Sequence, residues 1–174
     1  METQKYYRTY ASVDLSAIEN NINELKKKLK KGVLTLATVK ADAYGHGAVE
    51  VAKALVESGA DMFGVAAIDE AVELRENGVT APILILGQIF SQDYETAIEN
   101  DITCTIIDIV TAHGLSKKAQ ELGKIAKVHI KIDTGMGRIG FQPDENGEKE
   151  IKSVFDLPYL SIDGAFTHFA NADT

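Results

Sequence analysis

The sequence predicts an α/β fold, namely a partial (β/α)₈ barrel of about six parallel strands with helices outside. Short apolar runs rich in β-forming residues alternate with segments of helical apolar spacing, and this alternation requires parallel strands joined by crossover helices. A doubly wound sheet begins with the same alternation, so periodicity alone leaves both folds open. Lys40, Asp133 and His168 each follow an apolar run. Because barrel enzymes carry their chemistry at the C-terminal ends of the strands, these polar residues favour the barrel.

The composition excludes several classes of protein. The chain has 174 residues, 45% of them hydrophobic and 25% charged, which is typical of a globular domain with its own core. Its net charge of −8 argues against a nucleic-acid partner. There is no apolar run long enough for a membrane span and no apolar signal-peptide core near Met1. Because Cys104 is the single cysteine, we expect a cytoplasmic protein with no internal disulfide and no multi-cysteine metal site, and we predict no metal ligands elsewhere.

The first elements are predicted from local signals. Residues 9–13 are strand-like and belong to an opening segment, residues 1–14, that we separate from the barrel domain at residues 15–174. Ser16 followed by Glu19 predicts a capping box that starts a helix, and Gly32 predicts its end. The apolar face of that helix is supplied by Ile18, Ile22, Leu25 and Leu29.

The remaining elements follow in regular order. Strands are predicted at residues 33–39, 62–66, 83–86, 102–107, 126–132 and 160–166. Helices are predicted around residues 49–55 and 71–78, at 94–100 and 111–122, and from 144–150 onward. A closed barrel needs two more strands, and the chain ends directly after a strand, so we expect it to be part of a longer protein.

The first candidate site is the segment Thr38-Val-Lys-Ala-Asp-Ala-Tyr-Gly-His-Gly47. It places Lys40 at the end of a buried strand, where desolvation lowers the pKa of an amine as a Schiff-base lysine requires. Judged alone, Lys40 is more often a lysine that simply extends to water. The whole string closely resembles the pyridoxal phosphate (PLP) attachment motif of alanine racemases. That resemblance makes Lys40 the Schiff-base lysine and the catalytic base on the D-alanine side, gives Tyr44 a contact with the cofactor phosphate, and leaves His46 a structural role.

The second candidate site is the strand Val128-His-Ile-Lys-Ile-Asp133 and the glycine-rich loop after it. In a barrel, its apolar residues pack on the helices and Lys131 points inward, whereas an edge strand with a solvated polar face is the commoner source of such alternation. The string from Lys131 to Gly140 resembles the next motif of alanine racemases. By that resemblance, Arg138 contacts the cofactor's phenolic oxygen and the substrate carboxylate. The lysine matching Lys131 is carbamylated in some members.

The third site is the ending Thr167-His-Phe-Ala-Asn-Ala-Asp173, which also resembles a motif of the family. There, the histidine that matches His168 stacks against the pyridine ring of PLP. Cys104 lies on a predicted strand, and we expect it to be a small buried hydrophobic residue.

Three motifs in order thus resemble the PLP-dependent alanine racemases of fold type III. The resemblance implies a homodimeric isomerase that interconverts L- and D-alanine and supplies D-alanine for cell-wall peptidoglycan. In the family, the opening strand joins a C-terminal β domain, and a tyrosine from the partner subunit is the second base. Neither lies in these 174 residues, so we expect the isolated chain to be inactive or nearly so.

Three other functions remain open at this stage. A serine or broad-specificity racemase shares the same N-terminal motifs. A non-catalytic PLP-binding homeostasis protein has the same barrel class but lacks the Asp-Thr-Gly-Met-Gly-Arg-Ile-Gly string found here. A non-enzymatic interaction module would require all three motif matches to be accidental.

Overall fold

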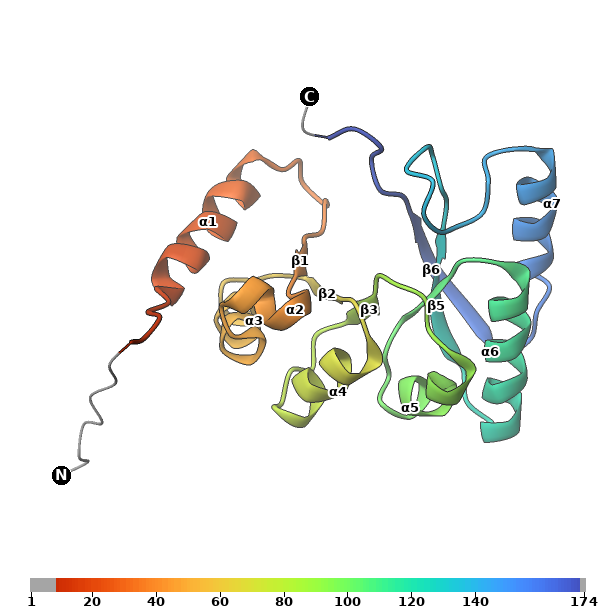
Figure 1. The fold of residues 1–174 in the computed structure, drawn as a ribbon, viewed down its shortest axis with the longest axis horizontal. Coiled ribbons are helices and arrows are strands. Elements are labelled where there is room, and N and C mark those ends of the chain that lie inside the picture. Colours follow the sequence, from red (N-terminus) through yellow and green to blue (C-terminus); the bar gives the residue numbers. More distant parts are fainter. Residues whose placement is uncertain (1–8, 173–174) are drawn as a thin grey trace.

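The computed structural model describes residues 9–172, and all the strands found there run parallel (Figure 1). They are β1 (Leu36–Thr38), β2 (Met62–Val65), β3 (Ile83–Ile85), β4 (Cys104–Ile106), β5 (Ala126–Lys131) and β6 (Leu160–Phe166). Strands β1 to β3 pair in sequence, and so do β4 to β6. A parallel bridge between Leu84 and Thr103 joins the two groups, so the strands follow one another in chain order.

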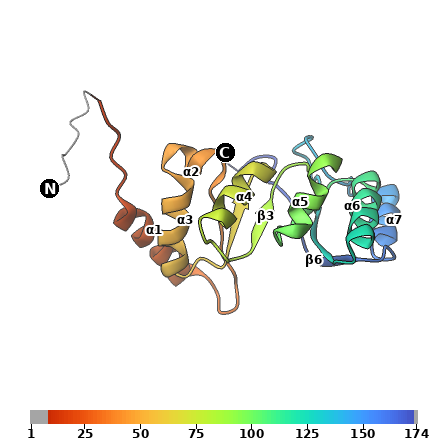
Figure 2. The same cartoon turned by 90° about the horizontal axis from the view of Figure 1, so that it is seen from below.

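This strand order decides between the two predicted folds in favour of the barrel. A doubly wound sheet reverses its strand order part-way and places helices on both faces. Here the order never reverses, and α3 to α7 follow one another around one side of the strands (Figures 1 and 2). The helices are α1 (Leu15–Lys28), α2 (Lys40–Gly45), α3 (Ala48–Glu57), α4 (Ile68–Glu76), α5 (Tyr94–Glu99), α6 (Ile109–Leu122) and α7 (Glu145–Val154). A 3₁₀ turn, η1 (Ser91–Asp93), precedes α5.

The start of the first helix differs from the prediction. Asp14 is the N-cap of α1, because its carboxylate accepts from the amide of Ala17 at 3.2 Å. The hydroxyl of Ser16 donates to Asp14 at 2.6 Å instead of capping the helix itself. The predicted capping box of Ser16 and Glu19 is therefore wrong, since an equally good cap residue stands two positions earlier. The helix also ends at Lys28, before Gly32.

The predicted N-terminal strand is not formed in the part that the structure describes. Residues 9–14 are neither helix nor strand. Residues 1–8, which complete the predicted opening segment, lie outside the described residues. A strand needs a neighbouring strand to pair its backbone groups, and none of the strands β1 to β6 pairs with residues 9–14.

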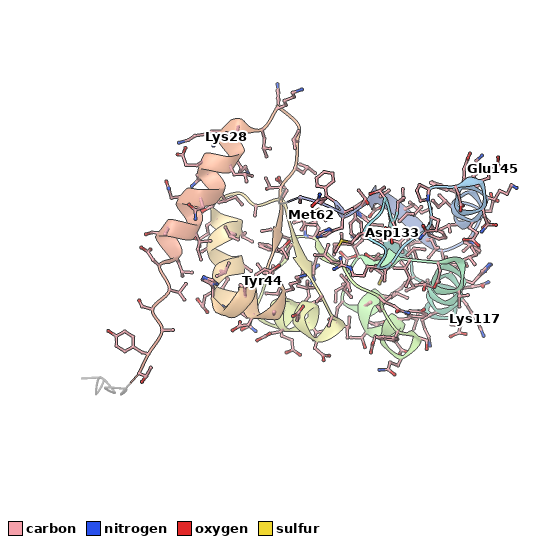
Figure 3. The ribbon with its side chains drawn as sticks, turned by 45° about the horizontal axis from the view of Figure 1, so that its top comes forward. Lys28, Tyr44, Met62, Lys117, Asp133 and Glu145 are labelled. Atoms are coloured by element: carbon pink, nitrogen blue, oxygen red, sulfur yellow. The ribbon has the colours of Figure 1, made fainter. Side chains whose placement is uncertain are left out.

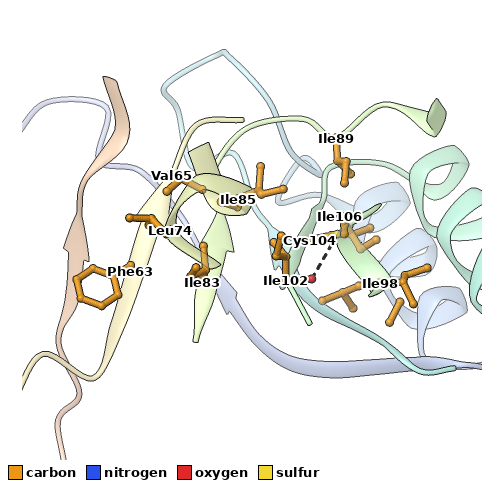
Figure 4. Packing of buried hydrophobic residues seen from close by; sticks show 14 of the residues in the cluster. Phe63, Val65, Leu74, Ile83, Ile85, Ile89, Ile98, Ile102, Cys104 and Ile106 are labelled. Carbon is orange, nitrogen blue, oxygen red and sulfur yellow. Dashed lines mark hydrogen bonds between the residues drawn. The ribbon is translucent and has the colours of Figure 1, made fainter. Parts of the chain in front are cut away.

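The core lies between the strands and the helices. Phe63, Leu74, Ile83 and Ile85 are fully buried there. Figure 4 shows Cys104 close to isoleucine side chains, and burial raises the pKa of its thiol to about 12. A thiol with such a pKa is unreactive at neutral pH, which agrees with the predicted role of Cys104 as a buried hydrophobic residue.

Arg75 of α4 ties the N-terminal ends of two strands together. Its guanidinium donates to the carbonyls of Val79 and Ala81, both at 2.7 Å, and to those of Asn100 and Asp101, both at 3.1 Å. These carbonyls lie in the segments that lead into β3 and β4. The bonds therefore hold the start of both strands against α4.

We expect Arg75→Met to lower the free energy of unfolding by about 2–3 kcal/mol, because four carbonyls lose a charged donor at once. Urea denaturation of the two proteins measures the difference. Arg75→Lys should recover only part of the loss, since an ammonium cannot reach four carbonyls as a planar guanidinium does. A methionine variant as stable as the original chain would contradict this role.

Candidate functional site

The chain leaves β1 through an unusual turn that begins at Lys40. The four residues after it, Ala41 to Tyr44, have positive φ angles of 51°, 53°, 50° and 56°. The α2 segment is therefore a left-handed turn. For each L-residue this conformation costs roughly 1–2 kcal/mol, so contacts outside the turn must stabilise it.

Several contacts hold the later part of this turn. The carboxylate of Asp42 accepts from the amide of Ala48 at 2.7 Å, at the start of α3. Nδ1 of His46 lies 2.8 Å from the carbonyl oxygen of Ala43, which agrees with its predicted structural role. Gly45 and Gly47 have φ angles of 85° and 86°, which glycine adopts without steric cost, and they form the tight turn into α3.

Lys40 and Tyr44 point into the same region. The Lys40 amine lies 6.0 Å from the centroid of the Tyr44 ring. Lys40 is half-buried, whereas Tyr44 is 62% exposed at the surface of α2 (Figure 3). A phenol is therefore available beside the amine.

Beyond β5, the buried carboxylate of Asp133 organises the glycine-rich loop. Its Oδ1 accepts from the amides of Gly135 and Gly137, both at 3.0 Å, and its Oδ2 accepts from that of Arg138 at 2.8 Å. These amides hold the pKa of Asp133 below its usual value. At the base of the loop, the amide of Phe141 donates to the carbonyl of Lys131 at 2.9 Å. The position of Arg138 is thus fixed through its own backbone.

Lys40 and Arg138 meet at one hollow. Its walls come from the ends of β1, β2 and β3 and from the loop after β5, and its volume is about 240 Å³. It is lined by Lys40, Ala66, Leu86, Gly87, Arg138 and Ile139. Among the described residues, no carboxylate lines it. Two cations converge there in a chain whose net charge is −8.

Lys131 is buried close to this site, with 2% of its surface exposed. Its amine donates to the carbonyl of Ile132 at 2.9 Å and lies 5.7 Å from the centroid of the Phe166 ring. Burial lowers the pKa of Lys131; the carboxylate of Asp133 opposes this effect and the charge of Arg138 adds to it. Because β5 pairs with β4 and β6, the edge-strand interpretation of this segment is wrong.

The third motif reaches the second one, but His168 does not reach the hollow. The hydroxyls of Thr134 and Thr167 lie 2.7 Å apart and join the two segments. His168 is exposed, with Nδ1 2.9 Å from the carbonyl oxygen of Phe169. Tyr44 likewise does not line the hollow. Because β6 is the last strand of the sheet, the segment after it has a neighbouring strand on one side only.

Comparison with known proteins identifies the family. Residues 13–174 match the family model described as alanine racemase, N-terminal domain. The chain belongs to this family. It is 45% identical, over 164 residues, to the alanine racemase of Methanococcus maripaludis, and the match covers 94% of this chain and 44% of that protein.

Solved structures of racemases share the fold. The alanine racemase of Clostridium difficile 630 in complex with cycloserine has a TM-score of 0.91 and 45% identity, with 92% of this chain and 44% of that one covered. The histidine racemase of Leuconostoc mesenteroides has a TM-score of 0.83 and 32% identity, with 92% and 43% covered. The chain thus spans less than half the length of these relatives, so the activity of the whole protein is a proposal.

The sequence motifs did not reveal the carboxylates that hold this racemase-family site in place. Asp133 appeared only as a polar residue at a strand end. Its signal was available: an aspartate followed by glycines two and four positions later can accept several amides of one turn. Asp42 was missed although its partner, the Ala48 amide, stands only six residues later. Glu70 of α4 accepts from the Ala41 amide with its Oε1, and this contact gave no local signal, because the two residues are 29 positions apart.

Proposed function

We propose that the chain is the cofactor-binding part of a PLP-dependent alanine racemase, with Lys40 as the residue that attaches the cofactor and as the base on the D-alanine side. One observation carries this proposal: Lys40 and Arg138 line one hollow at the C-terminal ends of the strands. This is the end of a barrel where enzymes carry their chemistry. The homology with alanine racemases supports the choice of substrate.

The residues at the hollow fit an anionic cofactor. PLP, when bound, supplies an electron sink that acidifies the α-proton of an amino acid. The planar guanidinium of Arg138 can donate two parallel hydrogen bonds to a carboxylate or bind a phenolic oxygen. No carboxylate among the described lining residues competes for these donors. Lys40 offers an amine that can bond an aldehyde and accept a proton. We assign Tyr44 to the phosphate and His168 to the face of the ring.

Lys131 is proposed to be carbamylated in the intact protein. A buried amine whose pKa is lowered by burial is nucleophilic, and a carbamate there would turn a cation into an anion beside Arg138. In bicarbonate buffer, we expect the intact mass to increase by that of one carbon dioxide, and we expect Lys131→Ala to abolish this increase. An unmodified mass at neutral pH would overturn this assignment.

The location, oligomeric state and biological role of the whole protein are also proposals. We infer that the whole protein is a cytoplasmic homodimer that makes D-alanine for peptidoglycan, with its second base supplied by the partner subunit. No helix within residues 9–172 combines the length and apolar character needed to cross a bilayer. The 174-residue chain alone should show little or no racemase turnover.

Borohydride reduction of the chain mixed with PLP, followed by peptide mass mapping, tests the cofactor site. We expect one pyridoxyl adduct, on Lys40, because this lysine lines the hollow together with Arg138. Exposed lysines such as Lys53 and Lys124 serve as internal controls for unspecific reaction. An equal spread of adducts over these lysines would count against the proposal.

A racemase for another amino acid is the second candidate. The fold similarity to a histidine racemase favours it, because the same scaffold there serves another substrate. Turnover of the full-length protein on L-alanine, L-serine and L-histidine separates the two. We expect the highest kcat/KM for alanine, and a higher value for either other amino acid would favour the second candidate.

A further inference from the structure

Glu70 makes contacts that a helix cap alone does not explain. It lies in the first turn of α4, and its Oε2 accepts from the amides of Ala66 and Ala67 at 2.6 and 3.3 Å. These bonds are those of a glutamate that caps its own helix. Its other oxygen, Oε1, accepts at 2.7 Å from the amide of Ala41, which is 29 residues earlier in the chain. One carboxylate therefore joins the end of β2 to the end of β1.

The Ala41 amide is the first peptide group after Lys40. Its position sets the plane of the peptide that carries the Cα atom of Lys40, and hence the direction in which the lysine side chain leaves the backbone. Ala41 is also the first residue of the left-handed turn. Glu70 fixes the start of that turn, while Asp42 fixes its end through the amide of Ala48.

The two strand ends that Glu70 joins are walls of the same hollow. Ala66 and Lys40 both line it. We propose that Glu70 is a positioning residue for Lys40: its carboxylate stabilises the left-handed turn and so directs the lysine amine into the hollow. The expected effect of Glu70 on PLP binding rests on the proposed function of Lys40. Its effect on the conformation of the turn does not.

Glu70→Gln tests the proposal with little change in shape. An amide has one oxygen in place of two, so either Ala41 or the start of α4 faces an N–H group instead of an acceptor. Glu73→Gln is the matched control, because Glu73 is exposed, lies on the same helix and loses the same charge. Both variants are made in the full 174-residue chain.

The first measurement needs no cofactor. The backbone carbon chemical shifts of Ala41 to Tyr44 report the left-handed conformation. In Glu70→Gln, we expect these shifts to move towards the values of a flexible chain that averages over several conformations. Those of β4 and β5 should stay in place, as should all shifts in Glu73→Gln. Unchanged shifts in the turn of Glu70→Gln would overturn the proposal.

The second measurement uses PLP. We expect Glu70→Gln to weaken the affinity for PLP and the yield of the Lys40 adduct by roughly tenfold, the usual effect of removing a supporting contact. A loss no larger than that of Glu73→Gln would overturn the proposal. If the original chain forms no adduct, the proposed function fails, whereas the chemical shifts still decide the role of Glu70.

Hydrogen exchange on the unaltered chain gives an answer even where a variant fails to fold. The Ala41 amide donates to Glu70 and should exchange at least tenfold more slowly than a free amide, since breaking the bond requires opening the turn. Exchange as fast as that of an unstructured peptide would overturn the proposal.

Discussion

Replacing Lys40 with methionine is expected to abolish covalent attachment of PLP. Lys40 carries the only primary amine among the side chains that line the hollow in the described part of the chain. The nearby amine of Lys131 is buried and donates to the carbonyl of Ile132, so it does not substitute. Methionine keeps the length of the side chain and removes the amine. In the full-length protein, the loss of a base should lower kcat by roughly 10²–10⁴-fold.

Peptide mass mapping after borohydride reduction measures the loss of attachment, and circular dichroism confirms that the variant is folded. Lys53→Met is the matched control, because Lys53 is exposed on α3 and the charge change is the same. It should keep the adduct on Lys40. Full retention of attached cofactor in Lys40→Met, on any other lysine, would show that the attachment site is elsewhere.

The elements of this fold were predictable because they depend on local patterns. Every strand lies within its predicted range, since a short apolar run rich in β-forming residues is a local signal. The ends of the strands were predicted less well. Val33 and Leu34 are apolar but 51% and 70% exposed, and β1 begins only at Leu36. Where a strand begins depends on the strand that pairs with it, which lies elsewhere in the sequence.

The left-handed turn after Lys40 was not predictable. The residues Ala-Asp-Ala-Tyr have no local preference for positive φ, and two of them are alanines, which favour right-handed helix. The carboxylate of Glu70 and the start of α3 favour the turn, and tertiary structure brings Glu70 there from 29 residues away. For the same reason, the motifs predicted the residues of the candidate site but not what holds them.

Replacing Asp133 with asparagine is expected to displace Arg138 and weaken PLP binding by roughly ten- to a hundredfold. Asparagine retains one oxygen, which can still accept from Gly135 and Gly137, but its amide nitrogen then faces the N–H of Arg138. The fold should persist, because the change is confined to one loop. Asp144→Asn is the matched control, since Asp144 caps α7 and asparagine caps a helix equally well. Equal PLP affinities of the two variants would contradict this role of Asp133.

The same variant has a distinct dependence on pH. Amides of the loop lower the pKa of Asp133 in the folded chain, so its carboxylate stabilises the fold fully above its unfolded pKa of about 3.9. That contribution is lost as the pH falls through the lower, folded pKa. The difference in unfolding free energy between the original chain and Asp133→Asn should therefore be constant above about pH 5 and shrink below about pH 4. Other carboxylates with lowered pKa values, such as Asp61, are present in both proteins and cancel from the difference. A difference that stays constant in acid would mean that the loop does not depend on the charge of Asp133.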